Sequence, residues 1–110
     1  MAASPVLYSR RLSSRIQASQ EVYVYWSCNG RDDLSRVHDL SVGGLFLESA
    51  RPRGVVGSIT KLHFLVSEGN IRADAVIRYV LPGKGLGLKL TALPEDDRPR
   101  FTSLMKRLRT

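Results

Sequence analysis

The stretch Asp39-Leu40-Ser41-Val42-Gly43-Gly44 lies between two apolar runs and decides how the first half of the chain folds. If the run up to Asp39 is a strand, its two-residue period places Asp39 and Ser41 on one face and Leu40 on the other. Gly43 and Gly44 permit a positive φ and carry no Cβ atom that would keep a ligand away. This pattern predicts a binding corner, and the plain alternative is a turn closed by an Asp side chain.

Short apolar runs on both sides of this corner predict six strands. Asn29-Gly30 is typical of a two-residue hairpin turn, so the runs beside it should pair antiparallel. The first run sets Val22, Val24 and Trp26 against Tyr23 and Tyr25. The expected strands cover residues 21–26, 34–40, 45–48, 59–66, 71–81 and 86–90.

The last dozen residues change to a helical period. Phe101, Leu104, Met105 and Leu108 follow the i, i+3, i+4, i+7 spacing of one apolar stripe. Acidic residues precede this segment and basic residues end it, as the helix dipole favours. We therefore expect a mainly β protein: a six-stranded antiparallel β-barrel over 21–90, with one amphipathic α-helix over 97–108.

A second motif lies upstream of the first strand, in the basic stretch Arg10-Arg11-Leu12-Ser13-Ser14-Arg15. Together the two stretches read R-x-x-x-R followed by D-x-S-x-x-G, and in this the chain resembles the PilZ domain family. The matching residues are Arg11 and Arg15 in the first motif and Asp39, Ser41 and Gly44 in the second. Ser14 is a departure, because many members have proline before the second arginine.

The resemblance extends to the late glycine-flanked run Gly85-Leu86-Gly87 and to the closing helix, and so covers nearly the whole chain. It implies a stand-alone receptor or adaptor that binds the bacterial second messenger cyclic di-GMP and relays it to a protein partner. The residues themselves present no catalytic set and no cluster with metal-ligand spacing. The two motif arginines would hold guanine or phosphate with their forked, flat guanidinium groups. Asp39 would accept guanine N–H groups or hold an arginine, and the Ser41 hydroxyl with the nearby Gly43 and Gly44 backbone would meet phosphate.

Three further basic residues are candidates for the same site. Arg78 is expected opposite a face shared by Ile77 and Tyr79, and Lys89 is expected on the barrel exterior; the alternative for both is ordinary surface charge. Arg10 precedes the first motif, at a position that in the PilZ family is thought to influence whether one cyclic di-GMP or a stacked pair is held. An arginine there would favour the pair by offsetting phosphate charge.

Length and composition predict one small domain. The 110 residues suffice for a single core, and a net charge of +7, with thirteen arginines among 17 basic residues, favours an anionic partner. We expect a flexible lead over 1–9 and a single domain over 10–110, in which residues 10–20 form a flexible basic arm. A lone cysteine, and the lack of a secretory signal or a long apolar run, indicate the cytoplasm.

Two other functions stay open from the sequence. The chain could be a small basic barrel that binds single-stranded nucleic acid by stacking bases on Tyr23, Tyr25 or Trp26. It could also be a PilZ-like module that has lost the nucleotide and binds only proteins. The downstream protein partner of a receptor is not identified by any motif.

Overall fold

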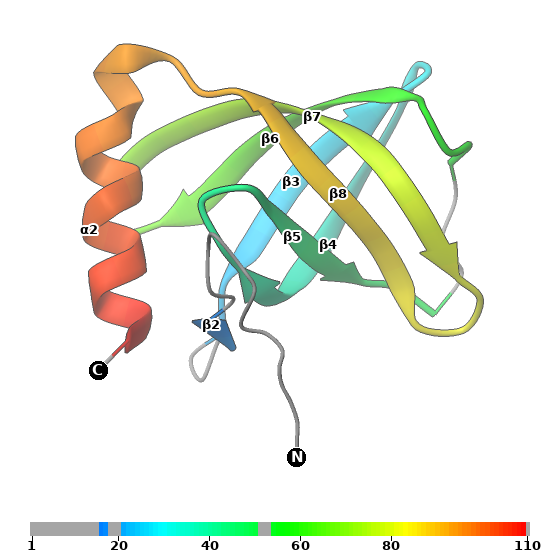
Figure 1. Cartoon of the computed structure of the whole chain (residues 1–110), viewed down its shortest axis with the longest axis horizontal. Coiled ribbons are helices and arrows are strands. Elements are labelled where there is room, and N and C mark those ends of the chain that lie inside the picture. The colour runs from blue at the N-terminus through cyan, green and yellow to red at the C-terminus, as the bar shows by residue number, and fades with distance from the viewer. Residues whose placement is uncertain (1–15, 18–20, 51–53, 110) are drawn as a thin grey trace.

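The computed structural model describes residues 16–17, 21–50 and 54–109. They form strands that lean around a common core, with a helix at the C-terminal end of the chain (Figure 1). The elements are β2 (Ile16–Gln17), β3 (Tyr23–Cys28), β4 (Arg31–Leu40), β5 (Gly44–Glu48), β6 (Ile59–Val66), β7 (Gly69–Leu81), β8 (Gly85–Ala92), the 3-10 turn η1 (Glu95–Asp97) and α2 (Arg98–Arg109).

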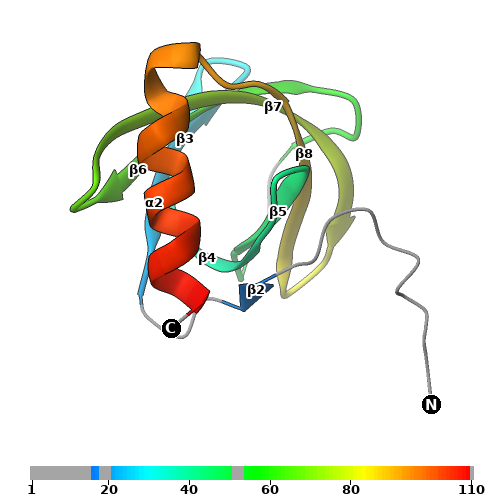
Figure 2. The ribbon, with the colours of Figure 1, turned by 60° about the vertical axis from the view of Figure 1, so that its left-hand side comes forward.

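Six of these strands close into an antiparallel barrel. The hydrogen-bonded order is β4-β3-β6-β7-β8-β5, and β5 pairs back onto β4. Figure 2 shows the strands curling into a ring, with α2 lying against one end of it. The six-stranded barrel predicted from the sequence is therefore confirmed, and closure leaves these six strands without an open edge.

Strict alternation on β3 and β6 supplies much of the core. Val22, Val24 and Trp26 are buried, whereas Tyr23 and Tyr25 are exposed, so the two sets lie on opposite faces as predicted. The Trp26 indole donates a hydrogen bond from Nε1 to Ser35 Oγ at 3.0 Å. Trp26 is thus an internal residue with its polar atom satisfied, and the expectation that it could stack on a nucleic-acid base is wrong.

The Asn29-Gly30 turn connects β3 and β4 with no extra residue. Both positions have positive φ, 53° and 78°, as a two-residue hairpin turn of this kind requires. Cys28 pairs directly with Arg31, so β4 begins at Arg31 and not at residue 34 as expected. Because the turn is tight, the β3–β4 pairing includes the polar residues 31–33, whose sequence alone does not predict a strand.

Two bulges change the faces of β4 and β7. On β4 the register passes from Val37 to Asp39 opposite consecutive residues of β5, which makes His38 the extra residue. On β7 it passes from Ile77 to Tyr79 opposite consecutive residues of β8, which makes Arg78 the extra residue. Ile77 is fully buried but Tyr79 is exposed, so the expected common face of these two residues is wrong.

Helix α2 follows η1 and closes one end of the core. Its apolar stripe is buried, and Phe101 meets Phe64 of β6 edge to face with ring centroids 6.0 Å apart. Asp97 accepts a hydrogen bond from the Arg72 backbone N–H at 2.9 Å, which ties η1 to β7. The helix runs from Arg98 to Arg109, against an expected 97–108, and neither it nor η1 has the length and apolar character needed to cross a bilayer.

A short strand that the sequence did not predict lies beside β4. In β2, Ile16 and Gln17 pair antiparallel with Leu40 and Asp39. These two residues belong to the expected basic arm over 10–20. The other arm residues and the lead over 1–9 lie outside the described residues.

Candidate ligand-binding face

The corner between β4 and β5 is a closed hydrogen-bonded turn. Ser41 donates its backbone N–H to Gly44 O at 2.8 Å, and its hydroxyl donates to the same oxygen at 3.3 Å. The Ser41 Oγ also accepts the N–H groups of Gly43 and Gly44, both at 3.2 Å. With Ser41 only 3% exposed, its hydroxyl serves the turn, and the expectation that it stands beside the Asp39 carboxylate on one face is wrong.

Gly44 is needed for close packing between strands. A Cβ at this position would lie 2.3 Å from the carbonyl oxygen of Leu88, a backbone atom of β8. Gly43 adds a second link, because its carbonyl accepts the Leu90 N–H at 2.9 Å. Neither Gly43 nor Gly44 is among the described residues with positive φ, so the left-handed backbone that glycine permits is not used here. These two glycines dock the corner onto β8.

Asp39 lies at the other end of the motif and faces outward. Its side chain is 17% exposed, and its Oδ2 lies 3.0 Å from His38 Nδ1. In the ladder it stands between Gln17 of β2 and Phe46 of β5. The carboxylate therefore lies where the barrel wall meets β2, the strand that directly follows the R-x-x-x-R motif in sequence.

A row of outward-facing residues continues from Asp39 across the barrel. The Cα partners run Asp39 to Phe46, Phe46 to Gly87 and Gly87 to Tyr79, across β4, β5, β8 and β7. The rings of Phe46 and Tyr79 stack with centroids 6.2 Å apart and planes at 27°, and His38 meets Phe46 edge to face at 6.0 Å. We call His38, Phe46 and Tyr79 the aromatic shelf.

Glycines on β8 provide the seat of this shelf. A Cβ on Gly87 would lie 2.2 Å from two ring carbons of Tyr79. A Cβ on Gly85 would lie 2.9 Å from the Phe46 ring and still closer to the backbone of Leu47. Because both positions lack a side chain, the two rings lie flat against the sheet.

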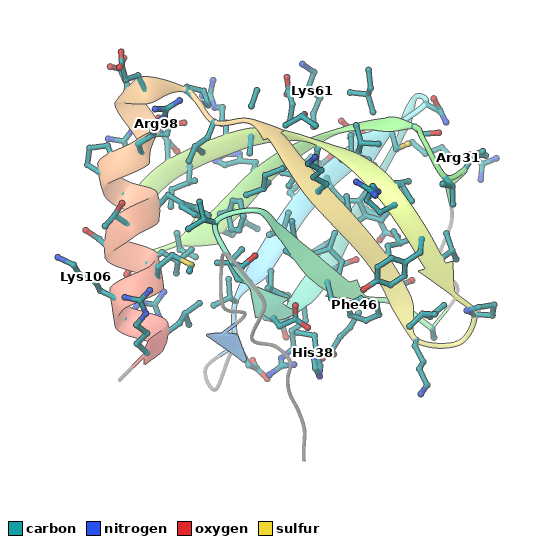
Figure 3. All side chains as sticks on the ribbon, viewed as in Figure 1. Arg31, His38, Phe46, Lys61, Arg98 and Lys106 are labelled. Atoms are coloured by element: carbon teal, nitrogen blue, oxygen red, sulfur yellow. The ribbon has the colours of Figure 1, made fainter. Side chains whose placement is uncertain are left out.

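The shelf borders an open hollow of about 620 Å³. Asp39 and Glu48 line it together with Lys84 of the β7–β8 turn. Figure 3 shows Phe46 and His38 on the side of the barrel away from Lys61. A flat aromatic surface beside a carboxylate and basic groups has the chemistry that holds a nucleobase and a phosphate.

Arg78 and Lys89 both project from the exterior close to this shelf. Arg78 is the bulge residue just before Tyr79, and Lys89 lies two residues beyond Gly87 and pairs with Gly44. Both are exposed. Among the described residues neither has an acidic side chain within ion-pair distance, so each adds net positive charge to the face.

The remaining predicted site residues, Arg10, Arg11 and Arg15, lie outside the described residues. Arg15 directly precedes Ile16 in the sequence, and Ile16 pairs with Leu40 next to Asp39. Sequence reasoning missed Phe46, Tyr79 and Lys84. The signal available for the two rings was the pair Gly85 and Gly87 within a strand, since such glycines mark a close approach of another group.

Comparison with known proteins decides the family. Residues 9–107 match the PilZ domain family. The chain belongs to the PilZ domain family. This is a family of binding domains and not of enzymes. No curated protein sequence matches the chain at a significant level.

Solved structures show the same fold. The Bacillus subtilis inhibitor of motility, MotI/DgrA, is 18% identical with a TM-score of 0.70, over 92% of this PilZ chain and 52% of the other. MrkH of K. pneumonia in complex with c-di-GMP is 19% identical with a TM-score of 0.72, over 90% and 51%. Its apo form is 20% identical with a TM-score of 0.66, over 86% and 49%. The PilZ chain therefore spans about half the length of these structures.

Proposed function

We propose that this PilZ chain is a cytoplasmic bacterial receptor that binds cyclic di-GMP on the face formed by Asp39 and the aromatic shelf. The observation that carries the proposal is the register row from Asp39 through Phe46 and Gly87 to Tyr79. It sets an exposed aromatic surface beside a carboxylate, next to β2, which directly follows the R-x-x-x-R motif in sequence. Membership of the PilZ family supports the same ligand.

Each group on this face has a role that suits a guanine dinucleotide. A guanine base can stack on the shelf, while the Asp39 carboxylate accepts its N1–H and N2–H₂ groups. Arg11 and Arg15 supply forked guanidinium donors for phosphate or for guanine O6 and N7. Arg78 and Lys89 add positive charge at the rim, where they favour the phosphates without fixing the base.

Ser41, Gly43 and Gly44 contribute to this site indirectly. Their hydrogen bonds hold the turn against β8, and the turn fixes the end of β4 where Asp39 stands. We therefore assign them to positioning. This replaces a direct contact between the Ser41 hydroxyl and a phosphate, because that hydroxyl already donates to Gly44 O.

Isothermal titration of cyclic di-GMP into the wild type tests the proposal. Arg11→Ala and Arg15→Ala should each weaken binding by about 2 kcal/mol, since each removes charge-assisted and stacking contacts. Arg31→Ala is the matched control, because Arg31 is exposed at the end of the barrel away from α2 (Figure 3). A wild type that binds GTP or a single-stranded oligonucleotide equally well, or binds no nucleotide, contradicts the proposal.

Ligand number is a finer part of the proposal and depends on Arg10. Two stacked cyclic di-GMP molecules bring four phosphate charges onto one surface, and a third arginine in the arm offsets part of their repulsion. The same titration should give two nucleotides per chain for the wild type and nearer one for Arg10→Leu. A wild-type stoichiometry of one contradicts this part even if Arg11 and Arg15 prove essential.

A further inference from the structure

A second surface hollow lies between α2 and the end of β8, and it is not part of the ligand-binding face. Its volume is about 450 Å³. The floor is apolar and consists of Leu90 and Leu93 from the β8 end of the chain with Phe101 and Met105 from α2. Phe101 and Met105 are almost fully buried, so the floor is continuous with the core. We call this hollow the helix groove.

The rim of the helix groove is positively charged. Arg98, Lys106 and Arg109 of α2 line it and are exposed, and none of the described residues that line it is acidic. Figure 3 shows Arg98 near the start of the helix and Lys106 nearer its end. These three residues form no ion pair with another described residue, whereas Arg100 and Arg107 of the same helix are bound to Asp97 and Glu68. The groove therefore carries positive charge that nothing in the described chain compensates.

The other wall of the groove belongs to the corner. Val42 lines the groove and is 68% exposed, although it lies inside the D-x-S-x-x-G motif between Ser41 and Gly43. The next residue, Gly43, is hydrogen-bonded through its carbonyl to Leu90, which is a floor residue. The motif that supports Asp39 on one side thus supplies an apolar side chain to the groove on the other.

We propose that the helix groove binds an acidic amphipathic segment of a protein partner, with its apolar side chains on the floor and its carboxylates at Arg98, Lys106 and Arg109. An apolar floor with a charged rim is the usual form of a groove that receives an amphipathic helix. The proposal deepens the proposed function by naming the surface on which the receptor would bind its protein partner. It rests on that function only for the identity of the signal, cyclic di-GMP.

Charge and shape favour this occupant over three others. A second copy of the chain would bring a net charge of +7 against a basic rim and be repelled. A bilayer surface cannot reach apolar side chains that form the floor of a hollow, because membrane-binding faces present such side chains outward. Single-stranded nucleic acid requires exposed rings for stacking, and Phe101, the aromatic residue of the floor, is buried.

Fluorescence anisotropy with a synthetic probe tests the proposal without nucleotide. The probe is a labelled 18-residue peptide with leucines at i, i+3, i+4 and i+7 and glutamates on its other face. Its controls are a scrambled peptide of the same composition and a version with lysine for glutamate. We expect the probe to bind the wild-type chain and both control peptides to bind at least tenfold more weakly.

Variants of exposed residues locate the binding. Lys106→Glu with Arg109→Glu reverses the rim and should weaken probe binding by at least tenfold, and Thr102→Trp, which fills the groove from an exposed helix position, should do the same. Arg31→Glu reverses a single charge at the far end of the barrel and should leave binding within twofold (Figure 3). Equal loss in Arg31→Glu and the rim variant, or no probe binding by the wild type, overturns the proposal.

Two further measurements separate the proposals from each other and from other occupants. The affinity for cyclic di-GMP should be unchanged in the rim variant. If the probe does not bind the groove, the nucleotide-binding result is therefore unaffected, and a chain that binds no nucleotide can still bind the probe. Vesicles of phosphatidylglycerol, or an oligonucleotide, should not compete with the probe when added at the same concentration of negative charge as the probe. If vesicles or the oligonucleotide bind the wild type in competition with the probe, and Thr102→Trp abolishes that binding, the assignment to a protein segment is overturned.

Discussion

The corner and the aromatic shelf are neighbours in the fold but differ in how far their side chains are buried and in whether those side chains are engaged by the backbone. In the corner, Ser41 is buried and its hydroxyl makes three hydrogen bonds to the backbone of the turn. On the shelf, Tyr79 is 42% exposed and its ring lies open beside a hollow. One short motif thus contains a part that holds the barrel together and, at Asp39, a part that lies beside the aromatic shelf and is proposed to bind the nucleotide. The role of each motif residue can therefore be assigned by whether its substitution lowers the free energy of unfolding or the affinity for nucleotide.

Gly44→Ala should produce the largest effect and tests the structural part. The added Cβ would lie 2.3 Å from a β8 carbonyl oxygen, and backbone atoms cannot move aside cheaply. We expect a loss of about 3 kcal/mol or more in the free energy of unfolding, measured by urea denaturation.

Gly30→Ala is the control for that variant. Gly30 has a φ of 78° but nothing near its missing Cβ, so alanine there should cost only about 1–2 kcal/mol of backbone strain. Equal losses at the two glycines would show that close packing on β8 is not what Gly44 provides.

Tyr79→Ala should change binding and leave the barrel folded. Removal of a stacking ring is expected to weaken cyclic di-GMP binding by about 1–3 kcal/mol, as titration calorimetry would show. Tyr25→Ala is matched to it, because Tyr25 is also an outward tyrosine of the barrel and is 45% exposed. If both variants bind like the wild type, the shelf is not the base platform.

Ser41→Ala should give a smaller loss that appears in stability. The N–H groups of Gly43 and Gly44 lose their side-chain acceptor, which is expected to lower the free energy of unfolding by about 1–2 kcal/mol. Ser67→Ala, at an exposed position in the β6–β7 turn, should change it by less than about 0.5 kcal/mol. Weaker binding of cyclic di-GMP by Ser41→Ala with an unchanged unfolding curve would instead indicate a direct contact.

Low pH should have the smallest effect on stability. It should leave the hydrogen bonds of the corner intact, because they involve no titratable group. Hydrogen bonds from Arg107 lower the pKa of Glu68, and the Arg72 backbone N–H, followed by Arg100, lowers the pKa of Asp97. Carboxylates with lowered pKa stabilise the fold above their unfolded pKa of about 4, and this stability is lost as pH falls through the folded value. Thermal melts should therefore show a falling Tm from pH 5 to pH 3, with a smaller fall in Glu68→Gln. An equal fall in that variant would exclude Glu68 as a source of the acid sensitivity.

Local pattern predicted most of the barrel. The strand Ile59–Val66 has the predicted bounds, because its alternation and its flanking turns are both encoded locally. The helix was predicted within one residue at each end, since its stripe and charge pattern agree. Pairing across the tight hairpin turn extended β4 beyond its apolar run to Arg31.

The candidate site was predicted less completely, for a physical reason. Bulges at His38 and Arg78 depend on the register of the partner strand, which no local period records. They turn Tyr79 outward and bring it level with Phe46 and Asp39. The hydrogen bonds of Ser41 likewise depend on how the turn closes, so the motif alone did not reveal that its hydroxyl is internal.

The most direct test of the central claim is an NMR titration of the ¹⁵N-labelled chain with cyclic di-GMP. The largest shifts of described amides should appear along the row Asp39, Phe46, Gly87 and Tyr79, where the nucleotide is proposed to bind. The amides of Tyr23, Tyr25 and His63, which lie on the paired strands β3 and β6, should stay unchanged. Largest shifts on β3 and β6, or no shifts at saturating nucleotide, would contradict the account.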